Sequence, residues 1–158
     1  MDIENPRKEP SGKKGGSSVS RTCLDQALVY LGIREHNRRE LELKLRTKGY
    51  GAAEIGSVLD SLEDDGSLSE ERYVRSFVRS STRRHPEGKA LMLRRLAAKG
   101  ADKETSEQVV SEIYTGEYTS QLMEQARALV VKKGRAKTED EIRFELAKLG
   151  FRISGSDY

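Results

Sequence analysis

An internal repeat constrains the fold of this chain more than any other feature of the sequence. When the sequence is shifted by 51 or by 101 residues, apolar residues coincide at two positions of every copy. The first position holds Leu41, Met92 and Ile142, and the second holds Leu45, Leu96 and Leu146. In every copy, a glycine stands four residues after the second position, at Gly49, Gly100 and Gly150. The chain is therefore an array of related units.

The spacing of the repeated positions favours a helix over a strand. Residues 40–46 alternate polar and apolar side chains, which in isolation is typical of a half-buried strand. However, Leu43 becomes Arg94 in the second copy, so the alternation is not repeated. Residues 37–46 are mostly good helix formers, and none is β-branched or aromatic. Asn37 is a suitable N-cap and Gly49 a suitable helix end, so we predict a helix between them.

A capping box predicts another helix immediately before this one. Thr22 and Asp25 have the spacing at which each side chain accepts a hydrogen bond from the other residue's backbone N–H. The apolar residues that follow have the spacing of one helix face. We expect that buried face to contain Leu24, Ala27, Leu28 and Leu31. Cys23 then lies in the first turn, where we expect it to be unreactive.

The remaining signals complete a three-helix unit. Ser69 is predicted to cap a helix that carries Tyr73, Val74, Phe77 and Val78 on one side. Other helices are predicted at 52–64, 88–99, 102–114, 118–133 and 138–149. The expected fold class is all-α, an elongated, curved array of about three tandem three-helix repeats, the last abbreviated. The expected divisions are a disordered tail at 1–20 and repeats at 21–66, 67–115 and 116–158.

Composition argues against several classes of function. A single cysteine, Cys23, cannot form an internal disulfide, and His36 and His85 lack metal-ligand spacing. The common nucleotide-binding, hydrolase and zinc-protease motifs are absent from the sequence. We therefore expect no catalytic, cofactor-binding or metal-binding residue, and no cofactor. The sequence also has neither a run of apolar residues long enough for a membrane span nor a secretory signal, so we expect a cytoplasmic protein that does not bind membranes.

Charge is unevenly distributed although the net charge is only +3. Residues 70–99 contain nine basic and three acidic residues, a net of +6. On a helix that turns by ~100° per residue, four arginines fall in one stripe opposite the predicted apolar side. These are Arg72, Arg75, Arg79 and Arg83, which we call the arginine ridge. The full set of candidate partner-binding residues is Arg72, Arg75, Arg79, Arg83, Arg84, Lys89, Arg94, Arg95 and Lys99.

The arginine ridge predicts an anionic partner, which is either nucleic acid or an acidic protein surface. Arginine suits bidentate contact with phosphate or carboxylate groups. A dedicated reader of base edges is disfavoured, because asparagine and glutamine are scarce along the ridge. Tyr73 and Phe77 are expected in the core rather than on a base-stacking surface. A long array with a basic middle is better suited to lying along another extended, repetitive structure.

Two segments of the sequence resemble the RecX family of bacterial regulatory proteins. They are "REHNRRELELKLRTKGY" at 34–50 and "VLDSLEDDGSLSEERYVRSFVRS" at 58–80, and the similarity extends over about residues 24–151. The resemblance implies an all-helical array of three-helix repeats. It also implies a non-enzymatic protein that binds in the groove of the filament formed by the RecA recombinase on single-stranded DNA. Such a protein usually suppresses the ATPase and strand-exchange activities of RecA.

Two alternatives remain open from the sequence. The first is a helical nucleic-acid-binding regulator that acts without the recombinase, through direct contact with single- or double-stranded DNA. The second is a structural scaffold that binds neither partner. In each case we expect a monomer.

Overall fold

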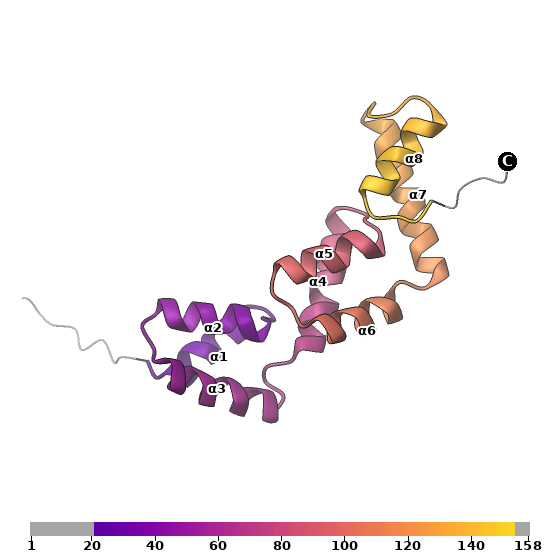
Figure 1. The fold of residues 1–158 in the computed structure, drawn as a ribbon. Helices are drawn as coiled ribbons and strands as arrows, with labels where there is room; N and C mark the ends of the chain where they lie inside the picture. The colour runs from indigo at the N-terminus through magenta and orange to yellow at the C-terminus, as the bar shows by residue number, and fades with distance from the viewer. Residues whose placement is uncertain (1–20, 154–158) are drawn as a thin grey trace, which may run out of the picture.

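The structure is a computed structural model that describes residues 21–153, and these residues form an elongated array of eight α-helices with no strand (Figure 1). The helices are α1 (Cys23–Ile33), α2 (Arg38–Thr47), α3 (Ala52–Asp64), α4 (Glu70–Arg84), α5 (Lys89–Ala98), α6 (Lys103–Ile113), α7 (Gly116–Lys132) and α8 (Glu139–Lys148). The predicted fold class is confirmed. The tail expected at 1–20 lies outside the described residues, as do residues 154–158.

Local capping interactions set the ends of the helices. The predicted capping box of Thr22 and Asp25 begins α1, and the side chain of Asn37 accepts a hydrogen bond of 2.7 Å from the backbone N–H of Glu40 at the start of α2. Helix α7 begins at Gly116 rather than at the expected residue 118. The reason is that the Thr115 side chain accepts a hydrogen bond from the backbone N–H of Tyr118 and so caps the helix earlier.

The three repeated glycines end α2, α5 and α8 in the same way. Gly49, Gly100 and Gly150 have φ angles of 95°, 77° and 84°, in the left-handed region that favours glycine. The backbone N–H of the next residue donates to the carbonyl five residues back, at 3.4, 3.1 and 3.2 Å respectively. This is the hydrogen bond of a Schellman motif. The sequence repeat therefore corresponds to a repeated helix end.

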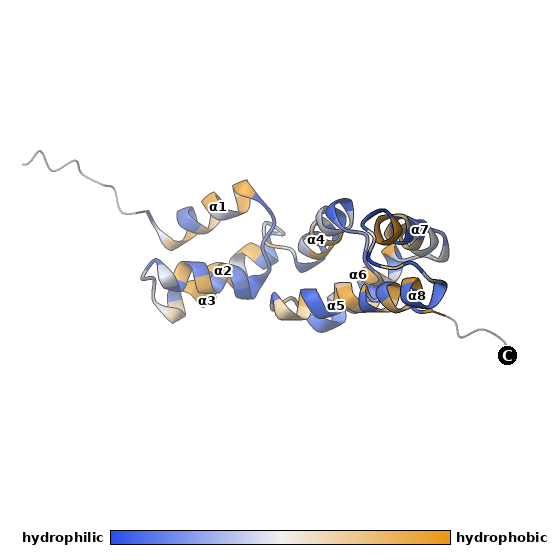
Figure 2. Cartoon of the chain, turned by 90° about the horizontal axis from the view of Figure 1, so that it is seen from above, coloured by the Kyte–Doolittle hydropathy of each residue, from blue (hydrophilic) through white to orange (hydrophobic). Residues whose placement is uncertain are grey.

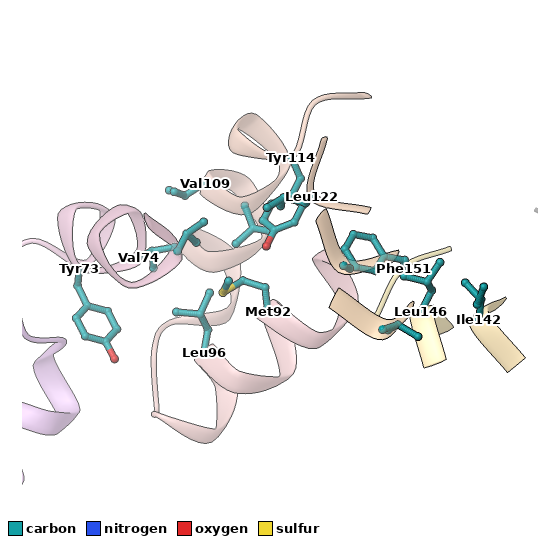
Figure 3. Close-up of a cluster of buried hydrophobic side chains, with 14 of the residues drawn as sticks. Tyr73, Val74, Met92, Leu96, Val109, Tyr114, Leu122, Ile142, Leu146 and Phe151 are labelled. Atoms are coloured by element: carbon teal, nitrogen blue, oxygen red, sulfur yellow. The ribbon is translucent and has the colours of Figure 1, made fainter. Parts of the chain in front are cut away.

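The repeated apolar positions form the core. Their relative exposures are Leu41 0%, Met92 0% and Ile142 6%, then Leu45 0%, Leu96 0% and Leu146 4%. Buried side chains from α1–α3 and Leu68 make one cluster, and those from α4–α8 and the loops beside them make another. Figure 3 shows that Met92 and Leu96 point into the second cluster, which extends to Ile142 and Phe151 in the third repeat. The first repeat thus has a hydrophobic core of its own.

The predicted buried face of α1 is wrong at two of its four positions. Leu24 and Leu28 are 43% and 45% exposed, whereas Cys23 and Ala27 are 1% and 0% exposed. Apolar residues occur along much of α1, so their periodicity does not select one face (Figure 2). The small side chains of Cys23 and Ala27 suit the side that packs against α2 and α3. The leucines lie about one residue, or ~100°, away around the helix.

The middle helices of successive repeats follow one another head to tail. At the N-terminus of α2, the side-chain amide of Asn37 donates to the carbonyl of Lys99, which caps the C-terminus of α5. At the N-terminus of α5, the backbone N–H of Gly88 donates at 2.7 Å to the carbonyl of Leu149, which caps α8. Each positive helix N-terminus therefore lies against a negative C-terminus, which stabilises the array.

Candidate interaction surface

Helix α4 has the two faces that the sequence predicts. Tyr73, Val74 and Val78 are buried, with relative exposures of 5%, 0% and 1%, and Phe77 packs against the same core. The four members of the arginine ridge are exposed on the other side. The buried face fixes the rotation of α4, so the directions of the arginines are set by packing rather than by chance.

The first half of the arginine ridge is engaged in contacts within the protein. Arg72 forms an ion pair of 2.9 Å with Glu35 of the first repeat and also donates to the carbonyls of Gly66 and Ser67. It therefore joins α4 to the preceding repeat. These three contacts use the guanidinium group in a structural role, which leaves few of its N–H groups for a partner.

Arg75 pairs with two carboxylates, one on α4 and one on α6. Its guanidinium lies 2.8 Å from Glu71 and 2.5 Å from Glu112. Hydrogen bonding to Arg75 lowers the pKa of the Glu112 carboxyl below its ordinary value. Arg75 is thus nearly neutralised by its surroundings, and the basic character of the ridge is concentrated in its second half.

The second half of the ridge is free of ion pairs among the described residues. It consists of Arg79 and Arg83, and Arg84 lies next to it in the sequence. All three arginines are exposed, and none forms an ion pair with any residue between 21 and 153. A hollow of about 440 Å³ between α4, α6 and α7 is lined by Arg79 and Arg83 together with apolar side chains such as Ile113 and Leu122. A second hollow, of about 200 Å³, lies beside Arg84. Both are open to solvent, as expected of a surface that meets a large partner rather than a small ligand.

Two serines connect this region to the junction between the first two repeats. Ser76 and Ser80 line the hollow beside Arg84 and also a neighbouring hollow of about 240 Å³ that includes Lys99. We call the surface formed by Arg79, Arg83, Arg84, Lys99, Ser76 and Ser80 the α4 patch. It brings together four cations and two hydroxyl groups, which are the usual protein donors to phosphate oxygens. The carboxylates of Glu35 and Glu40 also line the hollow that includes Lys99.

The other candidate residues on α5 lie in different environments. Arg95 pairs at 2.5 Å with the buried carboxylate of Glu87, and its guanidinium lies 5.4 Å from the centre of the Phe77 ring. The Lys89 ammonium donates at 2.8 Å to the hydroxyl of Ser111. Arg94 is exposed and lines a separate hollow between α5 and α6. The nine predicted residues therefore do not form one continuous surface.

The connection between α1 and α2 contains a buried histidine. His36 is 1% exposed, and its Nδ1 lies 2.9 Å from the carbonyl of Arg34. Because a carbonyl only accepts, Nδ1 carries the proton and Nε2 accepts from the Lys44 ammonium at 2.7 Å. Burial lowers the pKa of His36, so the ring is neutral. The carboxylate of Glu40 pairs with Arg34 beside it.

Within the described residues, no group of three histidine, cysteine, aspartate or glutamate side chains is placed to hold a metal ion. None of the helices between residues 21 and 153 is both long enough and apolar enough to cross a bilayer.

Comparison with known proteins identifies the relatives of this chain. Residues 23–62 match the family model described as RecX, first three-helix domain. A regulatory protein RecX from Prosthecochloris aestuarii is 36% identical over 95 residues, which cover 60% of this chain and 63% of that protein. One from Leptothrix cholodnii is 38% identical over 104 residues, which cover 66% and 62% respectively. The chain thus matches between half and two thirds of the length of such curated relatives.

Solved structures show the same fold. The crystal structure of RecX from Lactobacillus salivarius has a TM-score of 0.70 at 23% identity and covers 82% of this chain and 86% of its own. A crystal structure of regulatory protein RecX has a TM-score of 0.73 at 18% identity and covers 84% and 68%. At this level of identity the likeness concerns the fold alone. Together with the sequence relatives, it confirms the resemblance to the RecX family.

Proposed function

We propose that this chain, a relative of the RecX regulatory proteins, binds the filament that RecA forms on single-stranded DNA and inhibits its ATPase and strand-exchange activities. The observation that carries the proposal is the α4 patch, a group of cations without ion pairs among residues 21–153, in the middle of an elongated array (Figure 1). The repeats at 21–66, 67–115 and 116–158 are the units that we expect to contact the filament. We propose that the protein acts as a monomer in the cytoplasm.

The shape of the array supports a partner that is itself extended. Each repeat contacts only its neighbours, so the array is long and presents an extended surface to a partner. The junctions at Asn37 and Gly88 fix each repeat relative to the next one. A surface fixed in this way can contact several subunits of a filament at once. After the first contact has formed, each further contact is intramolecular and therefore loses little additional entropy.

The burial of Cys23 and His36 disfavours a catalytic role for these two residues. The thiol of Cys23 is 1% exposed, and burial raises its pKa, which disfavours the nucleophilic thiolate. His36 is equally buried, with Nδ1 bound to a carbonyl and Nε2 to an ammonium group. Neither group is available to attack or deprotonate a substrate.

A direct nucleic-acid regulator is the second candidate, and the composition of the α4 patch favours it. Ser76 and Ser80 lie among Arg79, Arg83 and Arg84, so hydroxyl and guanidinium donors are combined as in many phosphate contacts. The aromatic side chains that line the patch, Tyr73 and Phe77, belong to the hollow that includes Lys99 and pack in or against the core. Sequence-independent contact with the nucleic-acid backbone is therefore the expected mode.

Salt dependence separates the two candidates. A fluorescein-labelled single-stranded oligonucleotide is titrated with the protein, either bare or coated with RecA and a non-hydrolysable ATP analogue, between about 50 and 200 mM salt. A filament regulator binds the coated oligonucleotide more tightly than the bare one at every salt concentration. Equal or tighter binding to the bare oligonucleotide, with a steep salt slope, contradicts the first proposal and favours the second.

A further inference from the structure

A small hollow between α5 and α6 is distinct from the α4 patch. It has a volume of about 250 Å³ and is lined by Leu93 and Ala97 of α5, by Ala101 in the connection, and by Ser106 of α6. Leu93 and Ala101 also pack against the main core, so the floor of the hollow is continuous with the interior. We call it the α5–α6 pocket. Its walls carry very little polar surface.

The second repeat carries smaller side chains here than its neighbours do. Ala101 is the equivalent of Tyr50 in the first repeat and of Phe151 in the third, and all three follow the glycine that ends a middle helix. Phe151 is 5% exposed and lies in the core (Figure 3). Ser106 is the equivalent of Ile55, which is 1% exposed. The second repeat thus lacks an aromatic ring and an aliphatic side chain that the fold accommodates elsewhere.

Ser106 itself is not fully satisfied by the protein. It is 4% exposed, and its hydroxyl makes no hydrogen bond with any residue in the described part of the chain. A buried hydroxyl without a partner destabilises the folded state, because its hydrogen bonds to water are lost and not replaced. An isoleucine at this position would avoid that cost, as Ile55 does in the first repeat. At the pocket, the second repeat is therefore less well packed than the neighbouring repeats are at the equivalent place.

The rim of the pocket is basic. Arg94 and Lys103 stand on opposite helices, and Glu107 is the only carboxylate among the lining residues. The Lys103 ammonium lies 3.9 Å from Glu107, so these two charges largely cancel. Arg94 has no ion pair with any described residue and leaves a net positive charge at the mouth.

We propose that the α5–α6 pocket binds a phenylalanine or tyrosine side chain of an acidic peptide segment on a partner protein. The apolar wall and the missing aromatic ring at Ala101 select the side chain, and the free charge of Arg94 selects acidic flanking residues. Under the proposed function, on which this assignment of the partner rests, the segment belongs to the recombinase filament. One buried aromatic anchor surrounded by charged groups is a common arrangement in protein interfaces.

A matched pair of substitutions on α5 tests the pocket. Ala97 and Ala98 are adjacent and exposed, but only Ala97 lines the pocket. Leucine is close to alanine in helix propensity, so A97L and A98L both preserve α5, while only A97L fills the pocket. The probe is a fluorescein-labelled peptide of sequence Asp-Glu-Phe-Glu-Asp, together with the same peptide carrying alanine instead of phenylalanine. Circular dichroism melting confirms that both variants are folded.

The expected result is a loss of affinity of about tenfold or more for A97L and no more than about twofold for A98L. Replacing the phenylalanine of the probe is expected to weaken binding to the wild-type protein by about tenfold as well. Equal binding of both peptides overturns the proposal, because the contact is then electrostatic only. Equal binding of the phenylalanine peptide by folded A97L and wild-type protein overturns it too.

A second measurement separates the pocket from the proposed function. If the wild-type protein inhibits the RecA ATPase but A97L inhibits equally well, the pocket assignment fails and the proposed function stands. If the wild-type protein has no effect on RecA while the peptide result depends on Ala97, the pocket stands and the proposed function fails. Another occupant is the exposed Phe144 of a second copy. Self-association that is abolished by both A97L and Phe144→Ala would overturn the assignment to a partner protein.

Discussion

The side-chain amide of Asn37 donates a hydrogen bond of 3.2 Å to the backbone carbonyl of Lys99, 62 residues further along the chain. The oxygen of the same amide caps α2, so one side chain both begins a helix and joins two repeats. At the equivalent position of the second repeat, Gly88 makes its junction through the backbone instead. The two junctions therefore respond differently to substitution.

Asn37→Ser is expected to weaken the first junction while keeping the helix cap. Serine is about as good an N-cap as asparagine, but its shorter side chain does not reach Lys99. The expected loss of stability is about 1 kcal/mol for N37S and about 2 kcal/mol for N37A, which loses the cap as well. Urea unfolding followed by circular dichroism measures both values. Equal losses for the two variants would show that the bond to Lys99 contributes nothing.

Gly88→Ala is expected to disturb the second junction. A Cβ at Gly88 would lie 2.2 Å from the backbone oxygen of Gly150, so the backbone has to move. Overpacking of this kind costs about 1–3 kcal/mol. The control is Gly56→Ala inside α3, where a Cβ meets nothing within 4 Å. G56A is expected to be more stable than wild type by up to about 1 kcal/mol, because alanine favours helix. Thermal melts that show no loss for G88A would contradict the geometry of this junction.

Arg94 and Arg95 are neighbours, but only the substitution of Arg95 is expected to lower stability substantially. Arg95 neutralises Glu87, whose side chain is only 4% exposed, and it lies over the Phe77 ring. R95A leaves a buried carboxylate without its cation, and because Arg95 itself is half exposed we expect a loss of about 1–3 kcal/mol. R94A is expected to change stability by less than about 0.5 kcal/mol. Chemical denaturation of the two variants decides whether Arg95 is structural, as the ion pair indicates.

Stability is expected to fall as the pH is lowered through the range in which histidine titrates. Burial lowers the pKa of His36 in the folded protein, whereas the unfolded chain has the ordinary value of about 6.5. Below that value the unfolded state takes up a proton that the folded state resists, so unfolding is favoured. Protonation would also place a cation against Lys44 and Arg34, which the carboxylate of Glu40 offsets only in part.

The variant His36→Asn isolates this contribution, because an amide can still donate to the Arg34 carbonyl but does not titrate. Unfolding free energies of wild type and H36N are compared at pH 5, 6 and 7.5. The wild-type protein is expected to lose more stability than H36N toward pH 5. Parallel pH profiles for the two proteins would mean that His36 is not the group responsible.

Charge reversal in the α4 patch is expected to weaken partner binding without unfolding the protein. Arg79 and Arg83 are exposed and unpaired among the described residues, so R79E/R83E removes no internal ion pair. We expect affinity for RecA-coated single-stranded DNA to fall by about tenfold or more. The control is K132E/K133E at the end of α7, which makes the same change in net charge at exposed positions. If both double variants lost the same affinity, the loss would come from the change in net charge and not from the α4 patch.

The sequence predicts the helices well because their signals are local. The capping boxes at Thr22 and Thr138 and the left-handed Gly49, Gly100 and Gly150 lie where short-range geometry requires them. The buried face of α1 could not be predicted, because leucine and alanine compete on a helix that is apolar on several sides. That choice depends on how closely α2 and α3 approach, which is a property of the packed structure.

The candidate surface is only partly predictable for a similar reason. The arginine ridge follows from helical periodicity, and the structure places it opposite the buried face of α4 as expected. Which arginines are free depends on carboxylates far away in the sequence. Arg72 meets Glu35 and Arg75 meets Glu112, each 37 residues distant. No local pattern predicts these pairs, so the concentration of free charge at Arg79, Arg83 and Arg84 emerges only from the fold.

The most direct test of the proposed function is the single-stranded-DNA-dependent ATPase rate of the cognate RecA, measured while the wild-type protein is added at less than one molecule per RecA subunit. Regulation of the filament predicts a fall in rate at salt concentrations where the protein hardly binds bare DNA. An unchanged rate, together with tight and salt-sensitive binding to bare DNA, would contradict filament regulation and leave direct nucleic-acid binding as the function.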